Sequence, residues 1–459
     1  MQVQEYIRLD VHELASLIKD RQVSAQESLN CALARIDEVN PAINAIVTDC
    51  SAFAEQCLKE MRGDEPYYGV PLLVKDLGHA LKGVRSTEGS YFFSSNQAPQ
   101  TSDLLQKLIA LGFVPFAKTN TPELGLSYVT EPVLFGPCRN PYELSKTPGG
   151  SSGGSAAAIS SGIAPIATAS DGGGSIRIPA ACCGLFGFKP TTGLTPTGPW
   201  VGELWSGMAT NFILARSVRD TTTLFGKLAN LNQVYSLPEK RKPLKITYLE
   251  GVFAPVPVAS PYYEAVKKIE KLLEEAGHHV EKKHLELNLD AIGECALILI
   301  AANTCAEINL QQRILGRNAE RNELEPITWE FYQRGKAIQA HELINAKNNL
   351  YQLVRPLHEF LERTDLVLTP ALAQLPLDIG QLRMDDEFYS YLSKNTEFSP
   401  FTSIFNQAGL PAMTLPVSFH EQLPISIQMG AAQGNDLLLL SLAMELQPML
   451  SDLNLIPNI

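Results

Sequence analysis

One segment of the chain, from Pro148 to Ala180, is rich in glycine and serine and almost free of charge. Eight of the protein's 32 glycines fall within it, and only Asp171 and Arg177 can ionise there. Glycine at this density cannot fill a core, because it has no side chain to bury and its backbone loses much entropy on folding. We therefore expect two loops, 149–154 (GGSSGG) and 171–177 (DGGGSIR), in which the backbone turns sharply or approaches another group closely.

The residues between these loops predict how the loops are placed. Small residues over 155–161 indicate a helix, and the mainly apolar run 163–169 indicates a strand. A unit of loop, helix, strand, loop and helix can bring both loops to one edge of a sheet. Ser151 of the first loop and Ser175 of the second would then lie close together.

A buried strand is predicted upstream, over GVPLLV (69–74), by its continuous apolar run. Lys75 and Asp76 follow it directly. Neighbouring side chains of a strand point to opposite faces, so these two cannot both face one pocket. A lysine in this position is more often a surface residue. The two serine loops nonetheless favour a functional role for Lys75.

The residues that could act as a general base limit the class of hydrolase that the sequence can encode. No histidine lies in or beside either serine loop, the nearest being His79. A serine–histidine–aspartate hydrolase therefore has little support. A lysine can act as a general base when burial lowers its pKa toward neutrality, and Lys75 at the end of an apolar strand suits that role.

The remainder of the chain predicts one large unit. Residues 1–62 are expected to form a helical segment packed on a single catalytic unit, 63–459. A further short helix is predicted over 120–126, where Pro122 falls in the first turn. Residues 287–363 are expected to form long helices that build one wall of the substrate mouth.

Charge and cysteine content exclude several classes of protein. The net charge of −12 argues against nucleic acid or an anionic membrane as the main partner. The longest apolar runs fall well short of the roughly 18 residues that span a membrane. The eight cysteines show no CxxC spacing, which fits reduced thiols in a cytoplasmic protein and argues against a disulfide framework or a zinc site.

Several motifs together resemble the amidase signature family. They are GGSSGGS, the serine of DGGGSIRIPA 24 residues later, GLFGFKPTTG and the lysine of GVPLLVKDL. The match continues through TEPVLFGPCRNP and FNQAGLPAMTLP and covers most of the chain from Gly69 onward. It implies an α/β fold with a large twisted mixed sheet between helices (α/β/α), hydrolysis of an amide carbon–nitrogen bond, and no metal or organic cofactor. Within the family, KDLGHALKGVRSTEGS most resembles the branch of general amidases and 6-aminohexanoate cyclic-dimer hydrolases.

The resemblance also implies roles for individual residues. Ser175 would be the nucleophile, Ser151 the proton relay and Lys75 the base, with a cis peptide bond before Ser151. The oxyanion hole is assigned to the backbone N–H groups of Gly172, Gly173 and Gly174. The family usually has a threonine where this chain has Gly172, a change that spares the backbone donors.

Residues around the serine unit are assigned from their positions in the sequence. Asp171 and Arg177 are expected to pair and brace the glycine loop. Candidates for the substrate pocket, with ordinary packing as the alternative, are Tyr128, Thr130, Phe135, Trp200 and Trp205.

Two other functions stay open. The glutaminase subunit of a tRNA-dependent amidotransferase uses the same triad, but it usually carries KPTYGRVS where this chain has KPTTGLTP. A catalytically silent scaffold would need none of the three triad residues. We expect an amidase acting on a small-molecule amide in the cytoplasm, without a nucleic-acid or membrane partner, and forming a homodimer if it oligomerises.

Overall fold

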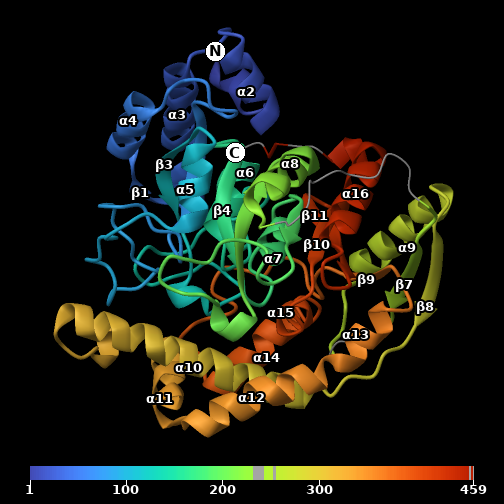
Figure 1. Ribbon diagram of the computed structural model, residues 1–459. Coiled ribbons are helices and arrows are strands. Elements are labelled where there is room, and N and C mark those ends of the chain that lie inside the picture. The colour runs from blue at the N-terminus through green and yellow to red at the C-terminus, as the bar shows by residue number, and fades with distance from the viewer. Residues whose placement is uncertain (231–241, 252–254, 454–455, 458–459) are drawn as a thin grey trace.

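The computed structural model describes residues 1–230, 242–251, 255–453 and 456–457, and shows helices arranged around two mixed sheets (Figure 1). The first sheet has five strands. In spatial order they are β1 (Ile46–Asp49), β3 (Phe113–Thr119), β2 (Val70–Lys75), β4 (Ile166–Asp171) and β6 (Thr210–Ala215). β2 runs parallel to β3 and β4, whereas β1 and β6 run antiparallel to their neighbours. Every residue of β2 is buried, so this strand carries Lys75 into the interior.

The second sheet has six strands. In spatial order they are β5 (Gly187–Lys189), β10 (Ala412–His420), β11 (Leu423–Ala431), β9 (Leu366–Pro370), β7 (Lys245–Leu249) and β8 (His279–Lys283). A bridge between Phe186 and Ala215 connects the edge of this sheet to β6 of the first. The α/β class is confirmed, but the single large sheet expected from the resemblance is formed as two sheets that meet at this bridge.

The first half of the chain supplies eight helices among the described residues. They are α1 (Val3–Tyr6), α2 (Val11–Lys19), α3 (Ala25–Ile43), α4 (Ser51–Glu60), α5 (Asp103–Ala110), α6 (Gly153–Ser160), α7 (Arg177–Cys182) and α8 (Val218–Leu228). Segment 1–62 is not purely helical, because β1 adds an edge strand to the first sheet. The N-terminal segment is therefore built into the same sheet as Lys75.

The second half supplies the remaining α-helices of the described chain. They are α9 (Ser260–Glu275), α10 (Leu289–Leu315), α11 (Pro326–Ala337), α12 (Ala340–Leu353), α13 (Arg355–Leu361), α14 (Phe388–Phe398), α15 (Ser403–Gln407) and α16 (Asp436–Leu446). Short 3₁₀ turns are η1 (Glu123–Gly125), η2 (Trp205–Gly207), η3 (Arg321–Glu323) and η4 (Gln447–Leu453). The helix predicted over 120–126 is only the turn η1, since Leu124 takes the left-handed conformation, with φ of +48°.

Helix α10 is long and apolar enough to cross a membrane by length and composition, and it alone passes this test within the described residues. A core helix passes the same test, so the finding by itself is weak evidence for a membrane span. α10 packs against α11 and α12, and the three helices lie together at the bottom of Figure 1. They form the long helical layer predicted for 287–363.

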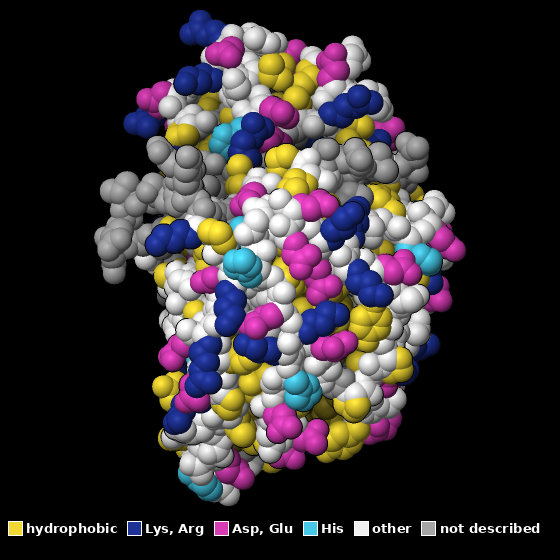
Figure 2. Space-filling model, turned by 90° about the vertical axis from the view of Figure 1, so that its right-hand side faces the viewer, with side chains coloured by type: hydrophobic (Ala, Val, Ile, Leu, Met, Phe, Trp, Pro, Cys, Tyr) yellow, Lys and Arg dark blue, Asp and Glu magenta, His cyan; other side chains and the backbone are white. Residues whose placement is uncertain are grey.

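Two further features of the molecule are the state of its cysteines and the distribution of charge on its surface. All eight cysteines lie in the described part of the chain, and each is buried and free of a disulfide. On the face shown in Figure 2, basic and acidic side chains alternate, and no broad basic area is visible among the described residues there. A nucleic-acid-binding face would concentrate lysine and arginine.

Candidate active site

Lys75 ends β2 and is completely buried. Its Nζ lies 2.7 Å from Ser151 Oγ, 2.9 Å from Ser152 Oγ and 2.9 Å from Ser170 Oγ. Among the described residues, no carboxylate lies within ion-pair distance of this amine. Burial lowers the pKa of Lys75 to about 7, although more distant carboxylates oppose the shift.

The hydroxyl groups around Lys75 differ in what they can do. Ser152 Oγ–H donates to the Ser170 carbonyl at 3.3 Å, and its oxygen accepts from Lys75 Nζ. A neutral amine has two N–H donors and one lone pair. The two donors can be used by Ser152 and Ser170, which leaves the lone pair to accept the Ser151 proton. The geometry therefore suits a neutral lysine acting as a base toward Ser151.

The two serine loops are joined to each other. The Ser152 N–H donates to the Ser175 carbonyl at 3.3 Å. The peptide bond between Gly150 and Ser151 is cis, as the resemblance implies. Within the described chain, no hydrogen bond joins the hydroxyl groups of Ser151 and Ser175. Ser175 is 6% exposed and Ser151 is 2% exposed, so both serines are almost completely buried.

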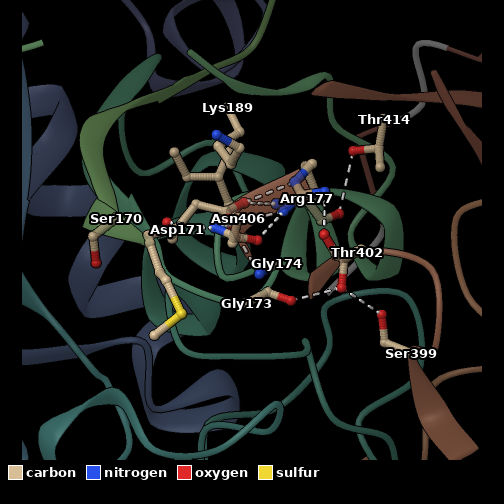
Figure 3. Close-up of polar contacts among 12 residues, drawn as sticks. Ser170, Asp171, Gly173, Gly174, Arg177, Lys189, Ser399, Thr402, Asn406 and Thr414 are labelled. Atoms are coloured by element: carbon tan, nitrogen blue, oxygen red, sulfur yellow. Dashed lines mark hydrogen bonds and ion pairs between the residues drawn. The ribbon is translucent and has the colours of Figure 1, made fainter. Parts of the chain in front are cut away.

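Asp171 and Arg177 form a buried ion pair at the end of β4 (Figure 3). Arg177 Nη2 lies 2.9 Å from Asp171 Oδ1, and its Nε lies 3.0 Å from Oδ2. Burial would raise the pKa of Asp171, but the charge and hydrogen bonds of Arg177 outweigh burial and hold it at about 2. Arg177 also donates to Asn406 Oδ1 and Gln428 Oε1, both at 2.6 Å. The pair thus ties β4 to α15 and to β11.

The backbone donors of the glycine loop are not equivalent. The Gly174 N–H donates to Asp171 Oδ1 at 2.8 Å. The N–H of Gly174, which the sequence analysis predicts as an oxyanion donor, therefore already has an acceptor in this structure. In the part of the chain that the structure describes, the N–H groups of Gly172, Gly173 and Ser175 have no acceptor.

Two of the five predicted pocket residues lie against this loop. A Cβ built on Gly172 would lie 3.0 Å from Trp205 Cε3, and one built on Gly173 would lie 2.8 Å from Tyr128 Oη. Both aromatic side chains are half-buried. The Trp205 ring thus lies so close that a side chain at position 172 would require it to shift.

The other three predicted pocket residues are placed differently. Thr130 is fully buried behind the first loop, where its Oγ1 donates to the Gly149 carbonyl at 2.8 Å. Phe135 is half-buried, with the Arg85 guanidinium 5.7 Å from its ring centroid. Trp200 is 49% exposed. Thr130 braces the loop backbone, and the other two show no contact with the serine loops among the described residues.

Among the described residues, the geometry supports neither His79 as an alternative base nor a metal site. His79 is fully buried, and within the described residues no hydrogen bond joins its ring to Ser151 or Ser175. Burial lowers its pKa to about 3, so the imidazole is neutral and unconnected to either serine. No group of three or more metal-ligating side chains is found in the described chain.

Sequence reasoning missed several residues of this site. Ser152 and Ser170 each stand next to a residue that had been singled out, yet neither was assigned a role. Asn406 lies in FNQAGLP, a motif that indicates the family but does not by itself indicate a role for this residue. Asn303 of α10 donates to Ser206 Oγ at 2.8 Å and so fastens the turn that carries Trp205. Nothing in the sequence pattern signals that last contact.

Comparisons with known proteins identify the family of the chain. The family model described as Amidase matches residues 27–440. The amidase AmiC of Mycobacterium tuberculosis (strain H37Rv) is 32% identical over 447 residues, which cover 96% of this chain and 94% of that protein. The lipoamidase of Enterococcus faecalis is 31% identical over 95% of this chain, which spans only 63% of the lipoamidase. The solved structure of 6-aminohexanoate cyclic dimer hydrolase superposes with a TM-score of 0.89 and 28% identity, covering 98% of this chain and 99% of that one.

The fold and these relatives define a hydrolase of the amidase class. The chain belongs to the amidase family, and its architecture is that of the amidase signature enzymes.

Proposed function

We propose that the protein hydrolyses the amide bond of a small-molecule substrate with Ser175 as nucleophile, Ser151 as relay and Lys75 as base. One observation carries the proposal. A buried amine without a carboxylate partner lies 2.7 Å from Ser151 Oγ, and the adjoining Ser152 N–H is bonded to the Ser175 carbonyl. The amine of Lys75, the hydroxyl of Ser151 and the loop that carries Ser175 thus lie close together.

The reaction follows from these positions. Ser175 Oγ attacks the amide carbonyl carbon while its proton passes to Ser151, whose own proton passes to the neutral Lys75 amine. The tetrahedral intermediate collapses as the carbon–nitrogen bond breaks, and the same path returns a proton to the leaving amine. Water then attacks the acyl-enzyme, and Lys75 accepts and returns its proton in the same way. The two serine hydroxyls must approach each other for the first transfer, as catalytic hydrogen bonds often do only when substrate is bound.

The oxyanion of the intermediate needs donors that have no other acceptor. Gly172, Gly173 and Ser175 offer such N–H groups, whereas Gly174 does not. Removing one donor of this kind typically costs about 10²- to 10³-fold in rate. We assign the oxyanion hole to this set, which keeps two of the three glycines predicted from the sequence and adds the nucleophile's own N–H.

The substrate is proposed to be a small amide, linear or cyclic. One relative is named a lipoamidase and another a 6-aminohexanoate cyclic dimer hydrolase, and we take an amide of a lipoyl group and a cyclic amide dimer as candidate substrates here. A glutaminase subunit is not favoured, since the named relatives are hydrolases rather than amidotransferase subunits. The chain is proposed to act alone in the cytoplasm, with no cofactor.

A panel assay tests this function. The purified protein would be incubated with an anilide, a lipoyl amide, the 6-aminohexanoate cyclic dimer and glutamine, while amine or ammonia release is followed. We expect release from at least one amide, and Ser175→Ala should lower that rate by about 10³-fold or more. A fluorophosphonate probe should label the wild type but not Ser175→Ala.

Ser160→Ala is the matched control. Ser160 lies on α6 in the same segment and is also 6% exposed, and within the described structure its hydroxyl has no hydrogen bond to Lys75, Ser151 or Ser175. Its replacement should leave turnover and labelling unchanged. Equal activity of Ser175→Ala and wild type would refute the assignment of the nucleophile, and an inactive wild type would favour the scaffold or the complex-dependent enzyme.

A further inference from the structure

We infer that Thr402 is a positioning residue for the reaction: its hydroxyl fixes the plane of the Gly173–Gly174 peptide and thereby aims the neighbouring N–H groups at the oxyanion. This inference rests on the proposed function. Thr402 lies in the link between α14 and α15, more than 220 residues beyond the glycine loop in the sequence. It is completely buried.

The peptide between the two glycines is held from both sides (Figure 3). Thr402 Oγ1–H donates to the Gly173 carbonyl at 2.7 Å, and the Gly174 N–H donates to Asp171 Oδ1 at 2.8 Å. The C=O and N–H of a trans peptide point in opposite directions. Two bonds at opposite edges therefore prevent the peptide plane from rotating.

A loop of glycines needs such an external restraint. Glycine populates positive and negative φ about equally, and Gly174 itself has φ of +132°. The Gly173 N–H precedes the clamped peptide by one Cα, and the Ser175 N–H follows it by one Cα. The clamp holds the ψ of Gly173 and the φ of Gly174, which are two of the four torsions that set the directions of these N–H groups relative to the fixed peptide.

The Thr402 hydroxyl is itself oriented by its surroundings. Its proton is given to Gly173, so the contact with Ser399 Oγ at 3.0 Å is one in which Ser399 donates and Thr402 accepts. Arg177 Nη1 donates to the Thr402 carbonyl at 2.9 Å, so one guanidinium fixes both the threonine and Asp171. The space is closed, because a Cβ on Gly174 would lie 2.4 Å from Thr402 Oγ1.

Thr402→Val removes the hydroxyl while keeping the shape of the side chain, and Thr402→Ser keeps the hydroxyl. We expect Thr402→Val to lower kcat by about tenfold to a hundredfold with KM changed by less than about threefold, since an oxyanion is bound only in the transition state. Thr402→Ser should return kcat to within about threefold of the wild type. The rate of fluorophosphonate labelling should fall in parallel with kcat.

Thr414→Val is the matched control. Thr414 is also completely buried and also donates to a backbone carbonyl, that of Arg177, at 3.2 Å, but in the described structure it has no hydrogen bond to residues 172–175 (Figure 3). Its replacement should lower thermal stability about as much as Thr402→Val does, with kcat nearly unchanged. Equal loss of kcat in both variants would show a merely structural role and overturn the inference, as would wild-type kcat in Thr402→Val or no rescue by serine.

The proposed function fails by a different result. If Ser175→Ala is as active as the wild type, the assignment of Ser175 as nucleophile is refuted. If the wild type itself is inactive, the proposed amidase function is refuted. Neither conclusion depends on the result for Thr402→Val. If Ser175→Ala is inactive while Thr402→Val is fully active, the function stands and the positioning role is refuted.

Discussion

Lys75 and Asp76 are neighbours in the chain but lie in separate environments. Lys75 Nζ contacts three serine hydroxyls, whereas Asp76 Oδ1 lies 2.5 Å from Lys118 Nζ. The alternation of a strand separates the two side chains, as the sequence predicts. The carboxylate closest in sequence therefore neutralises a different lysine, and burial is free to lower the pKa of Lys75.

The first prediction concerns the pH dependence of the wild-type enzyme. Proton transfer from Ser151 requires neutral Lys75, whose pKa is lowered to about 7. The rate should therefore rise with pH through neutrality and level off above it, with kcat/KM about tenfold higher at about pH 8 than at about pH 6. Initial rates across this range would measure it. A profile that falls as pH rises, or stays flat, would contradict a lysine base.

The second prediction concerns the buried ion pair. Arg177→Met leaves Asp171 charged and buried without its partner, which should destabilise the fold by about 3–5 kcal/mol. Denaturant unfolding would measure the loss. The exposed pair of Arg383 and Asp385 is the control, since both side chains are about half exposed and Arg383→Met should leave the unfolding midpoint unchanged. Similar midpoints for the two variants would mean that the buried pair contributes no more than a surface pair.

The third prediction concerns a helical glycine whose replacement by alanine should destabilise the protein, whereas such a replacement ordinarily stabilises a helix. Alanine is favoured over glycine inside a helix by about 1 kcal/mol. At Gly154 of α6, however, a Cβ would lie 2.4 Å from the backbone nitrogen of Asn120, so Gly154→Ala should destabilise the protein by at least about 1–3 kcal/mol. Gly293→Ala is the control, because α10 has open space at that position, and it should stabilise. Thermal melts would compare them, and a raised Tm for Gly154→Ala would show that α6 can move away.

The fourth prediction separates the two tryptophans of one loop. Trp205 lies against Gly172, whereas Trp200 is 49% exposed. Trp205→Ala should lower kcat/KM by about tenfold, equal to about 1.4 kcal/mol of lost transition-state binding, while Trp200→Ala should have no effect. Steady-state kinetics with the best amide of the panel would test both. If Trp200→Ala were the damaging change, the pocket would lie elsewhere.

The elements best predicted from the sequence are those with a strong local pattern. The apolar strand ending at Lys75, the small-residue helix α6 and the two loops around Ser151 and Ser175 all follow from local composition. β1 was missed because four residues between two helices are too few to show alternation. The turn η1 was predicted as a helix because the proline signal at Pro122 does not report the left-handed Leu124 that follows.

The site itself was predictable only in part. The resemblance placed Lys75, Ser151 and Ser175, but contacts made across the fold carry no local signal. Thr402 and Gln428 reach the glycine loop from sequence positions more than 200 residues away, through tertiary packing alone. Gly174 is a different case, since its N–H donates to Asp171, only three residues away, a carboxylate that the sequence analysis pairs only with Arg177.

Arg177 links the segment that contains the proposed triad to the second half of the chain. The three residues of the proposed triad all lie before position 176, yet the guanidinium that orders their loop finds its other acceptors at Thr402, Asn406 and Gln428. A fragment ending after the first sheet would contain the whole signature and still lack these acceptors. The catalytic segment is therefore not a portable module, because the acceptors that hold its guanidinium come from the second half of the chain.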